Sequence, residues 1–313
     1  MAISQFFRAL FSHSTAPNTT DLSFGLLEQT AVKLLLRQKQ WAQLEARVAQ
    51  LSEEELTRLL DGLCLTDRYT LPLSQYLQAG TSDLRRLVAG IQQSFLAWQA
   101  RGMGGGSSLT EKQIQGFLQH LHKAQEYLSH TFSSPQLQAE AYARLIRVEM
   151  GLSAADAAQQ AFYACRELAP HHLLGHMHYF KLASPRWLGD QEILAEFVDE
   201  APTAELHGLL QANFLVEMYS DLYNENTLTA KQELLQAHQN RINQLLPGTA
   251  PLDNNTLLAI YYNNYFACLN HILGYSDVRN AFLAALEGHI TFYPWAYFGL
   301  DTPAAVQKLL PRR

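Results

Sequence analysis

The architecture of this chain is set by its central stretch, which reads SPQLQAEAYARLIRVEMG (134–151), LSAADAAQQAFYACRELAP (152–170) and HHLLGHMHYFKLASPRW (171–187). The pattern predicts three helices joined by two tight turns. Pro135 suits the first turn of a helix, where its missing N–H has no helical partner to lose. Gly151 predicts a left-handed residue at the end of the first helix, and Ser153 predicts the N-cap of the second. Pro170 ends that second helix.

The second of these helices is unusually rich in small side chains. They are Ala154, Ala155, Ala157, Ala158, Ala161 and Ala164. Small side chains allow a neighbouring helix to approach closely, as two-helix repeats require. The stretch therefore predicts a repeat-like array of antiparallel helix pairs.

Residues 134–170 resemble a degenerate tetratricopeptide repeat, a helix pair with a set pattern of large and small residues. With the closing proline of that pattern placed on Pro170, the matching positions hold Tyr142, Leu145, Ala158, Phe162 and Cys165. Ile146 and Glu149 depart from the pattern, which has a small residue and an aromatic residue there. The resemblance implies an all-α fold, a tetratricopeptide-like α-α superhelix built as a solenoid of antiparallel helix pairs.

In such a solenoid the first helix of each pair lines the concave side. Carried over by position, the resemblance places four residues of 134–151 and one of the following helix on that side. They are Glu140, Ala143, Arg147, Met150 and Lys181. We expect this side to be a protein-binding groove.

A second resemblance is to a bacterial helical family known only as a domain of unknown function. The matching stretches are LLLRQKQWAQLEARVAQL (34–51), FYACRELAP (162–170), SPRWLGDQEILAEFV (184–198), NHILGYSDVRNAFLAALEG (270–288) and WAYFG (295–299). This family implies a helical repeat fold and no established catalytic residues.

Composition excludes several classes of function. The chain has 313 residues, 48% of them apolar, and a formal net charge of −6. An acidic balance argues against nucleic-acid binding, which needs a basic surface, and favours a basic protein partner. No stretch approaches the roughly 20 apolar residues of a membrane-spanning helix. Cys64, Cys165 and Cys268 lie far apart in apolar stretches, so we expect buried free thiols and a cytoplasmic location.

The sequence RGMGGGSS (101–108) is the best candidate for a domain boundary. We expect an N-terminal helical region at 1–100, a glycine-rich linker at 101–109, and a repeat region at 110–313 with a C-terminal cap. A phosphate-binding loop is disfavoured, because the Lys-Ser/Thr ending is missing and a helix precedes the glycines. The amphipathic start, MAISQFFRALFSHST (1–15), predicts a docking helix, with membrane-surface association as the alternative.

Further helices follow from apolar periodicity and capping residues. We expect one helix over about Leu22–Arg37, another beginning at the capping box of Ser52 and Glu55, and a third over about Ser82–Arg101. Pro72 marks a loop over Thr66–Leu73. No sustained alternation of apolar and polar residues predicts strands.

The histidines of 171–178 are the most conspicuous chemical candidates. His172 and His176 lie four residues apart on a helix, a spacing that can hold zinc, but a third ligand is not evident nearby. The alternatives are buried, hydrogen-bonded histidines at a repeat boundary and a contact surface whose charge changes near pH 6. No nucleophile motif is complete, so we expect neither catalytic residues nor a cofactor.

Two further sets of residues are candidates for protein contact. Tyr261, Tyr262 and Asn264 belong to the run YYNNY, which one helix turn cannot bury entirely. The alternative for this run is an interior hydrogen-bonded network. Arg186, beside Trp187, is the other candidate.

The sequence as a whole predicts a non-catalytic, protein-binding helical-repeat protein. Within that class the favoured hypothesis is a bacterial immunity protein or adaptor that occludes a cognate, toxin-like partner. The alternative is a metal-dependent enzyme or metal-binding protein that uses His171–His178. A ligand-sensing regulator is a third class, and the oligomeric state stays open.

Overall fold

The computed structural model describes residues 21–102 and 109–311. Within these ranges every regular element is a helix and no strand occurs, which confirms the all-α prediction for this part of the chain. No helix in the same ranges is both long and apolar enough to cross a membrane. The predicted docking helix at 1–15 and most of the glycine-rich stretch lie outside the described residues.

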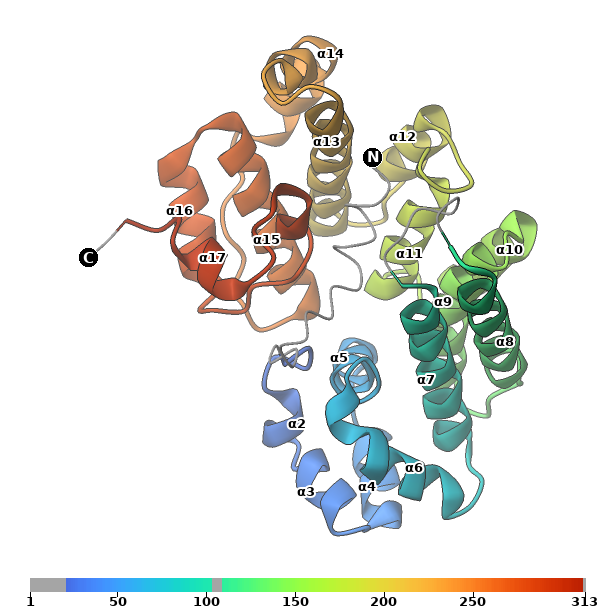
Figure 1. The fold of residues 1–313 in the computed structure, drawn as a ribbon. Helices are drawn as coiled ribbons and strands as arrows, with labels where there is room; N and C mark the ends of the chain where they lie inside the picture. Colours follow the sequence, from blue (N-terminus) through green and yellow to red (C-terminus); the bar gives the residue numbers. More distant parts are fainter. Residues whose placement is uncertain (1–20, 103–108, 312–313) are drawn as a thin grey trace. The chain divides into compact units, whose positions relative to one another are not determined.

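The chain divides into two compact units (Figure 1). Among the described residues, the first unit comprises 21–102 and 109–190, and the second comprises 191–311. The division falls between Asp190 and Gln191 and not at the expected linker 101–109. The physical reason is that the helices on either side of that stretch pack together. A Cβ on Gly90 of the earlier helix would lie 2.6 Å from Cγ of Leu128 on the later one.

The first unit contains α2 (Leu26–Gln29), α3 (Val32–Arg37), α4 (Trp41–Val48), α5 (Glu53–Cys64), η1 (Asp67–Tyr69), α6 (Thr70–Gln78), α7 (Asp83–Arg101), α8 (Glu111–Leu128), α9 (Pro135–Gly151), α10 (Ala155–Leu168) and α11 (Leu173–Ala183). Helix α9 packs against α10, α11 and α8, and it also touches α5 and α7. Its alanines Ala139, Ala141 and Ala143 are buried and allow these close approaches.

The second unit contains α12 (Gln191–Asp199), α13 (Ala204–Glu225), α14 (Ala230–Leu245), α15 (Leu257–Leu273), α16 (Ser276–Ala285), η3 (Trp295–Phe298) and α17 (Pro303–Gln307). Helix α15 packs against both α13 and α16, and almost all of its side chains are buried. Trp295 of η3 is fully buried, and its indole N–H donates to Oδ1 of Asn264 over 2.9 Å. This bond ties η3 to the interior of the second unit.

The turn between α9 and α10 differs from its prediction. Gly151 is the last residue of α9, while the left-handed conformation falls on Ser153, with φ of 60°, and Ala154 is the N-cap. The glycine serves packing instead. A Cβ on Gly151 would lie 2.8 Å from Cδ1 of Leu121 and 3.1 Å from Cζ of Phe117, both on α8. Close contact between α8 and α9 therefore requires a residue without a side chain.

Two other local predictions need correction, and two are confirmed. The single helix expected over Leu22–Arg37 is broken into α2 and α3 by Ala31, which is left-handed. Pro72 lies in the first turn of α6, where a missing N–H leaves no helical bond unmade, so it does not mark a loop. The capping box of Ser52 and Glu55 occurs as predicted, and the helix expected over about Ser82–Arg101 is α7, with Ser82 as its N-cap.

Gly189 offers a sharp test of packing at the end of the first unit. A Cβ on this residue would lie 2.1 Å from the carbonyl oxygen of Ala183, the last residue of α11. We expect Gly189→Ala to destabilise the first unit by about 3 kcal/mol, because backbone has to move. Urea unfolding followed by tryptophan fluorescence measures this change.

Gly116→Ala is the matched control. Its Cβ would lie 3.3 Å from Cβ of Ala100, and alanine is the better helix former in the interior of α8. We expect a change within about 1 kcal/mol of the parent protein. Equal stability of the Gly189→Ala and parent proteins would contradict the close approach of residues 183 and 189.

Candidate functional site

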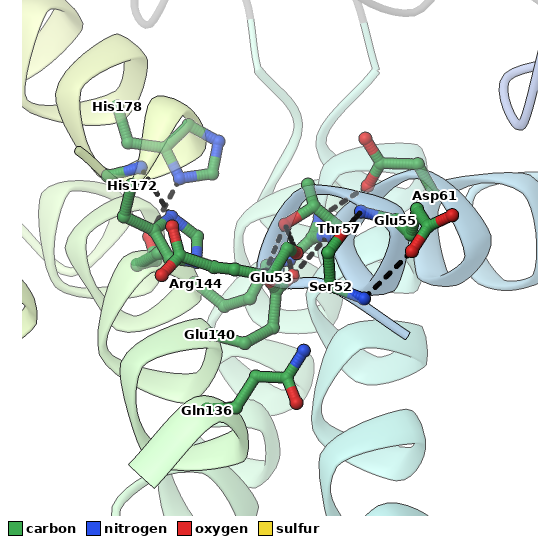
Figure 2. Close-up of polar contacts among 12 residues, drawn as sticks. Ser52, Glu53, Glu55, Thr57, Asp61, Gln136, Glu140, Arg144, His172 and His178 are labelled. Atoms are coloured by element: carbon green, nitrogen blue, oxygen red, sulfur yellow. Dashed lines mark hydrogen bonds and ion pairs between the residues drawn. The ribbon is translucent and has the colours of Figure 1, made fainter. Parts of the chain in front are cut away.

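A buried cluster of charged and polar side chains joins three elements of the first unit (Figure 2). Helix α5 supplies Thr57 and Asp61, and helix α9 supplies Glu140 and Arg144. Each pair is spaced by four residues, which places both members on the same face of their helix. His172, the residue before α11, completes the cluster. We call these five residues the Glu140 cluster.

Glu140 lies at the centre and has no solvent exposure. Its Oε1 lies 2.8 Å from Nε and 2.7 Å from Nη2 of Arg144. Its Oε2 accepts a hydrogen bond from the Thr57 hydroxyl over 2.5 Å and lies 3.1 Å from Nε2 of His172. Nη1 of Arg144 reaches Oδ1 of Asp61 over 2.6 Å. Arg144 therefore bridges the two carboxyl groups and ties α9 to α5.

The position of His172 fixes its tautomer. Its Nδ1 accepts a hydrogen bond from the backbone N–H of Gly175 over 3.3 Å, which caps the N-terminus of α11. A nitrogen that accepts cannot carry a proton, so the hydrogen of the neutral ring lies on Nε2 and faces Glu140. One imidazole thus joins the start of α11 to the buried carboxylate of α9.

The two carboxyl groups respond differently to the same surroundings. Burial acts most strongly on both and favours protonation, but at Glu140 it is outweighed by Arg144, His172 and Thr57, which lower the pKa to about 2. At Asp61 burial prevails over Arg144, and the nearby Glu140 adds to it, so the pKa is raised. Glu140 therefore remains ionised at neutral pH, with both of its oxygens engaged.

The chemistry available to the Glu140 cluster follows from these contacts. A general base needs a lone pair directed at a substrate proton, but the oxygens of Glu140 are directed at protein partners. Burial raises the pKa of the nearby Cys64 thiol to about 12, which leaves it a poor nucleophile. The arrangement is suited to holding α5, α9 and the start of α11 in one register.

Several predicted contact residues turn out to be interior. Glu140, Ala143, Met150, Tyr262 and Asn264 are all buried, so their expected positions on an exposed surface are wrong. Glu140 is the centre of the cluster described above. Asn264 accepts from Trp295 and from the backbone N–H of Thr291, and donates to the carbonyls of Ile260 and His289. For Asn264, the interior-network alternative is the correct one.

The remaining predicted contact residues are partly exposed. Arg147, Lys181 and Arg186 belong to the first unit and Tyr261 to the second. The guanidinium carbon of Arg147 lies 4.8 Å from the centre of the Trp98 ring, an arrangement typical of a cation–π contact. The predicted contact residues are therefore divided between the interior and the partly exposed surface of their own units.

The histidines of 171–178 have separate partners. His171 is exposed, His172 contacts Glu140 and Gly175, Nδ1 of His176 lies 3.1 Å from the carbonyl oxygen of His172, and Nδ1 of His178 lies 2.8 Å from that of Ala143. Across residues 21–102 and 109–311, no group of three or more His, Cys, Asp or Glu side chains is placed to hold a metal ion. The three cysteines are free and buried, as predicted.

Sequence reasoning missed Thr57, Asp61 and Arg144. The available signal was the spacing of four residues in Thr57–Asp61 and Glu140–Arg144. That spacing is equally common on solvated helix faces, where ion pairs of this kind are frequent. What distinguishes the buried case is contact between α5 and α9, which are about 80 residues apart in sequence.

Charge is distributed unequally between the two units. Residues 21–190 contain 16 acidic and 16 basic residues, whereas residues 191–313 contain 13 acidic and six basic residues. Eleven of those 13 acidic residues are exposed: Glu192, Glu196, Asp199, Glu200, Glu205, Glu225, Glu233, Asp253, Asp277, Glu287 and Asp301. The first five lie on or between α12 and the first turn of α13. The net negative charge of the protein therefore resides in the second unit.

Comparison with known proteins adds no further information, because no family model, no curated protein and no solved structure matches this chain.

The Glu140 cluster gives a stability prediction. We expect Glu140→Gln to destabilise the first unit by about 3–5 kcal/mol, because the amide cannot compensate the buried Arg144 charge. Glu28→Gln is the control in the same unit. Glu28 forms an exposed ion pair with Lys33, and loss of such a pair changes stability by about 1 kcal/mol or less.

Chemical denaturation of both variants measures the difference. Equal stabilities of the two variants would show that the Glu140 cluster does not hold the helices together.

Proposed function

We propose that this chain is a non-catalytic protein-binding protein whose second unit contacts a basic surface of its partner. The observation that carries the proposal is the concentration of net negative charge on the exposed surface of residues 191–311. Summed like charges raise the rate of encounter with an oppositely charged partner and select against partners of like charge.

Acidic residues are densest at the start of the second unit. From Trp187 to Ala230 the sequence has no lysine or arginine. Asp199 is the acidic residue here that pairs with a later arginine, since its Oδ1 lies 3.0 Å from Nη1 of Arg241. Glu192, Glu196 and Glu200 are exposed beside it and add to the local negative field.

The Glu140 cluster supports the non-catalytic part of the proposal. Its carboxylates, guanidinium and imidazole are directed at one another inside the first unit. Groups arranged in this way stabilise helix packing. We therefore expect the protein to act through the complementarity of its surface to a partner.

Packing in the first unit supports a tetratricopeptide-like arrangement as part of the proposal. Helix α9 packs against the next helix, α10, and against the one after it, α11. Contact with both following helices is what stacked antiparallel pairs require. Within this class we favour an immunity protein or adaptor that occludes a toxin-like partner, since an acidic surface suits the masking of a basic one.

The experiment is affinity purification with the full chain as bait, followed by measurement of binding to the captured protein. The test variant is Glu192→Gln/Glu196→Gln/Glu200→Gln, which removes three exposed charges and retains the Asp199–Arg241 pair. The control is Glu111→Gln/Glu126→Gln/Glu167→Gln, which removes three exposed charges from the first unit. We expect the test variant to weaken binding about tenfold or more at low salt, and the control to have little effect.

Salt dependence provides a second measure, because screening weakens interactions between exposed charges. We expect binding by the parent protein to fall as salt rises, and binding by the test variant to fall less. Failure to find any protein partner at micromolar concentration would contradict the proposal, as would a partner whose binding is unaffected by the triple variant and by salt.

A further inference from the structure

Helix α11 is the last helix of the first unit, and it is attached both by buried apolar residues, such as Tyr179 and Phe180, and by imidazoles. It packs on α9 and α10, and no later helix of the first unit covers it. Residues 184–190 then lead out of the unit, with Trp187 packed edge-on against Trp98. An element at the end of a helical array can separate without dismantling the helices before it.

His172 caps the N-terminus of α11. Its Nδ1 accepts a hydrogen bond from the backbone N–H of Gly175 over 3.3 Å, and its Nε2 lies 3.1 Å from Oε2 of Glu140 on α9. These two contacts tie the start of α11 to α9, and the two histidines within α11 lie farther along the helix.

His176, one turn later, is 2% exposed. Its ring meets that of Phe162 on α10 edge-on, with centroids 5.4 Å apart. Burial is the main influence that lowers the pKa of His176, to about 4, and the positive charge of Arg166 on α10 acts in the same direction. The hydrogen bond between Nδ1 of His176 and the backbone carbonyl of His172 opposes this shift in pKa without reversing it.

His178 contacts the other neighbouring helix. Its Nδ1 lies 2.8 Å from the carbonyl oxygen of Ala143 on α9. Burial, followed by the charges of Arg147 and Arg144, lowers the pKa of His178 to about 3, while Glu140 opposes the shift. The docked helix thus places its imidazoles beside arginines of both α9 and α10.

The direction of the pH effect follows from proton binding. An imidazole in water has a pKa near 6.5, so a released α11 binds protons between about pH 6.5 and pH 4 that the docked helix does not. The docked state is fully favoured above pH 6.5 and becomes progressively less favoured as the pH falls. Acidification therefore favours release.

We propose that α11 is an acid-sensitive latch, which leaves α9 and α10 when His176 and His178 are protonated while the other helices of the first unit stay folded. Release uncovers the side of α9 that includes Ala143 and the side of α10 that includes Cys165. This inference concerns a conformational change in the first unit and stands independently of the acidic surface of the second.

Cysteine reactivity can detect the change. A Cβ placed on Gly175 of α11 would lie 3.0 Å from Sγ of Cys165, so α11 directly covers this thiol. Cys64 lies in α5, where its burial by the helices before α11 needs no contact from α11, and Cys268 lies in α15 of the second unit. All three thiols are buried. Release of α11 alone exposes Cys165, and unfolding of the whole first unit exposes Cys64 as well.

The experiment is labelling of the full chain between pH 7 and pH 4.5 with 4,4′-dithiodipyridine, which reacts with thiols in mild acid. Mass spectrometry of peptides gives the rate at each cysteine, normalised to the rate in denaturant at the same pH. We expect the normalised rate at Cys165 to rise at least about tenfold between pH 7 and pH 5, with little change at Cys64 and Cys268.

Variants test whether the histidines are responsible. We expect His176→Phe, which retains a ring against Phe162, to reduce the rise at Cys165, and the exposed control His171→Gln to leave it unchanged. If Cys165 of His176→Phe is already reactive at pH 7, His178→Gln replaces it as the test variant. Protection of Cys165 down to pH 4.5, equal exposure of Cys165 and Cys64 at every pH, or a rise at Cys165 of the test variant equal to that of the parent protein would overturn the proposal.

Discussion

The first unit depends on the burial of one ionised carboxylate. Removing a carboxylate from water is so unfavourable that Glu140 is tolerated only with partners for both of its oxygens. Those partners come from α5, from the next turn of α9 and from the residue before α11. The requirement fixes the relative register of these elements, since sliding α5 by one turn would remove both Thr57 and Asp61. Apolar packing alone tolerates such shifts more readily.

Local features of this fold could be predicted because their causes are local. The capping box at Ser52 and Glu55 and the helix beginning after Ser82 depend on neighbours within four residues. Gly151 could not be interpreted in the same way, because it is required by Phe117 and Leu121 on another helix. Glycine after a helix and glycine inside a helix contact look alike in sequence. The same limit explains why Pro72 was predicted to mark a loop. The effect of a proline depends on whether it lies in the first turn of a helix or in its interior, and so on where the helix begins.

The candidate site was harder to predict than the fold. Repeat resemblance placed Glu140 and Met150 on an exposed side by position alone, but both are buried, and α9 contacts α5, α7 and α8 in addition to the two helices that follow it. Whether a charged residue at helical spacing is exposed depends on what packs over it, and that contact is distant in sequence. Buried free cysteines were predictable, because apolar neighbours in sequence are enough to indicate an interior position.

The two units place polar groups differently, and this difference bears on function. The interior of the second unit contains several neutral amides beside the buried carboxylate of Glu217. Asn263 pairs with both backbone groups of Leu252, and Asn270 donates to the carbonyl of Phe266. Amide networks of this kind satisfy buried backbone without burying charge. Most carboxylates of the second unit are consequently left at the surface, where they act together as a field on an approaching partner. Residues 21–190 of the first unit contain equal numbers of acidic and basic residues, and several of these are paired in the interior. The first unit therefore has no net charge comparable to that of the second.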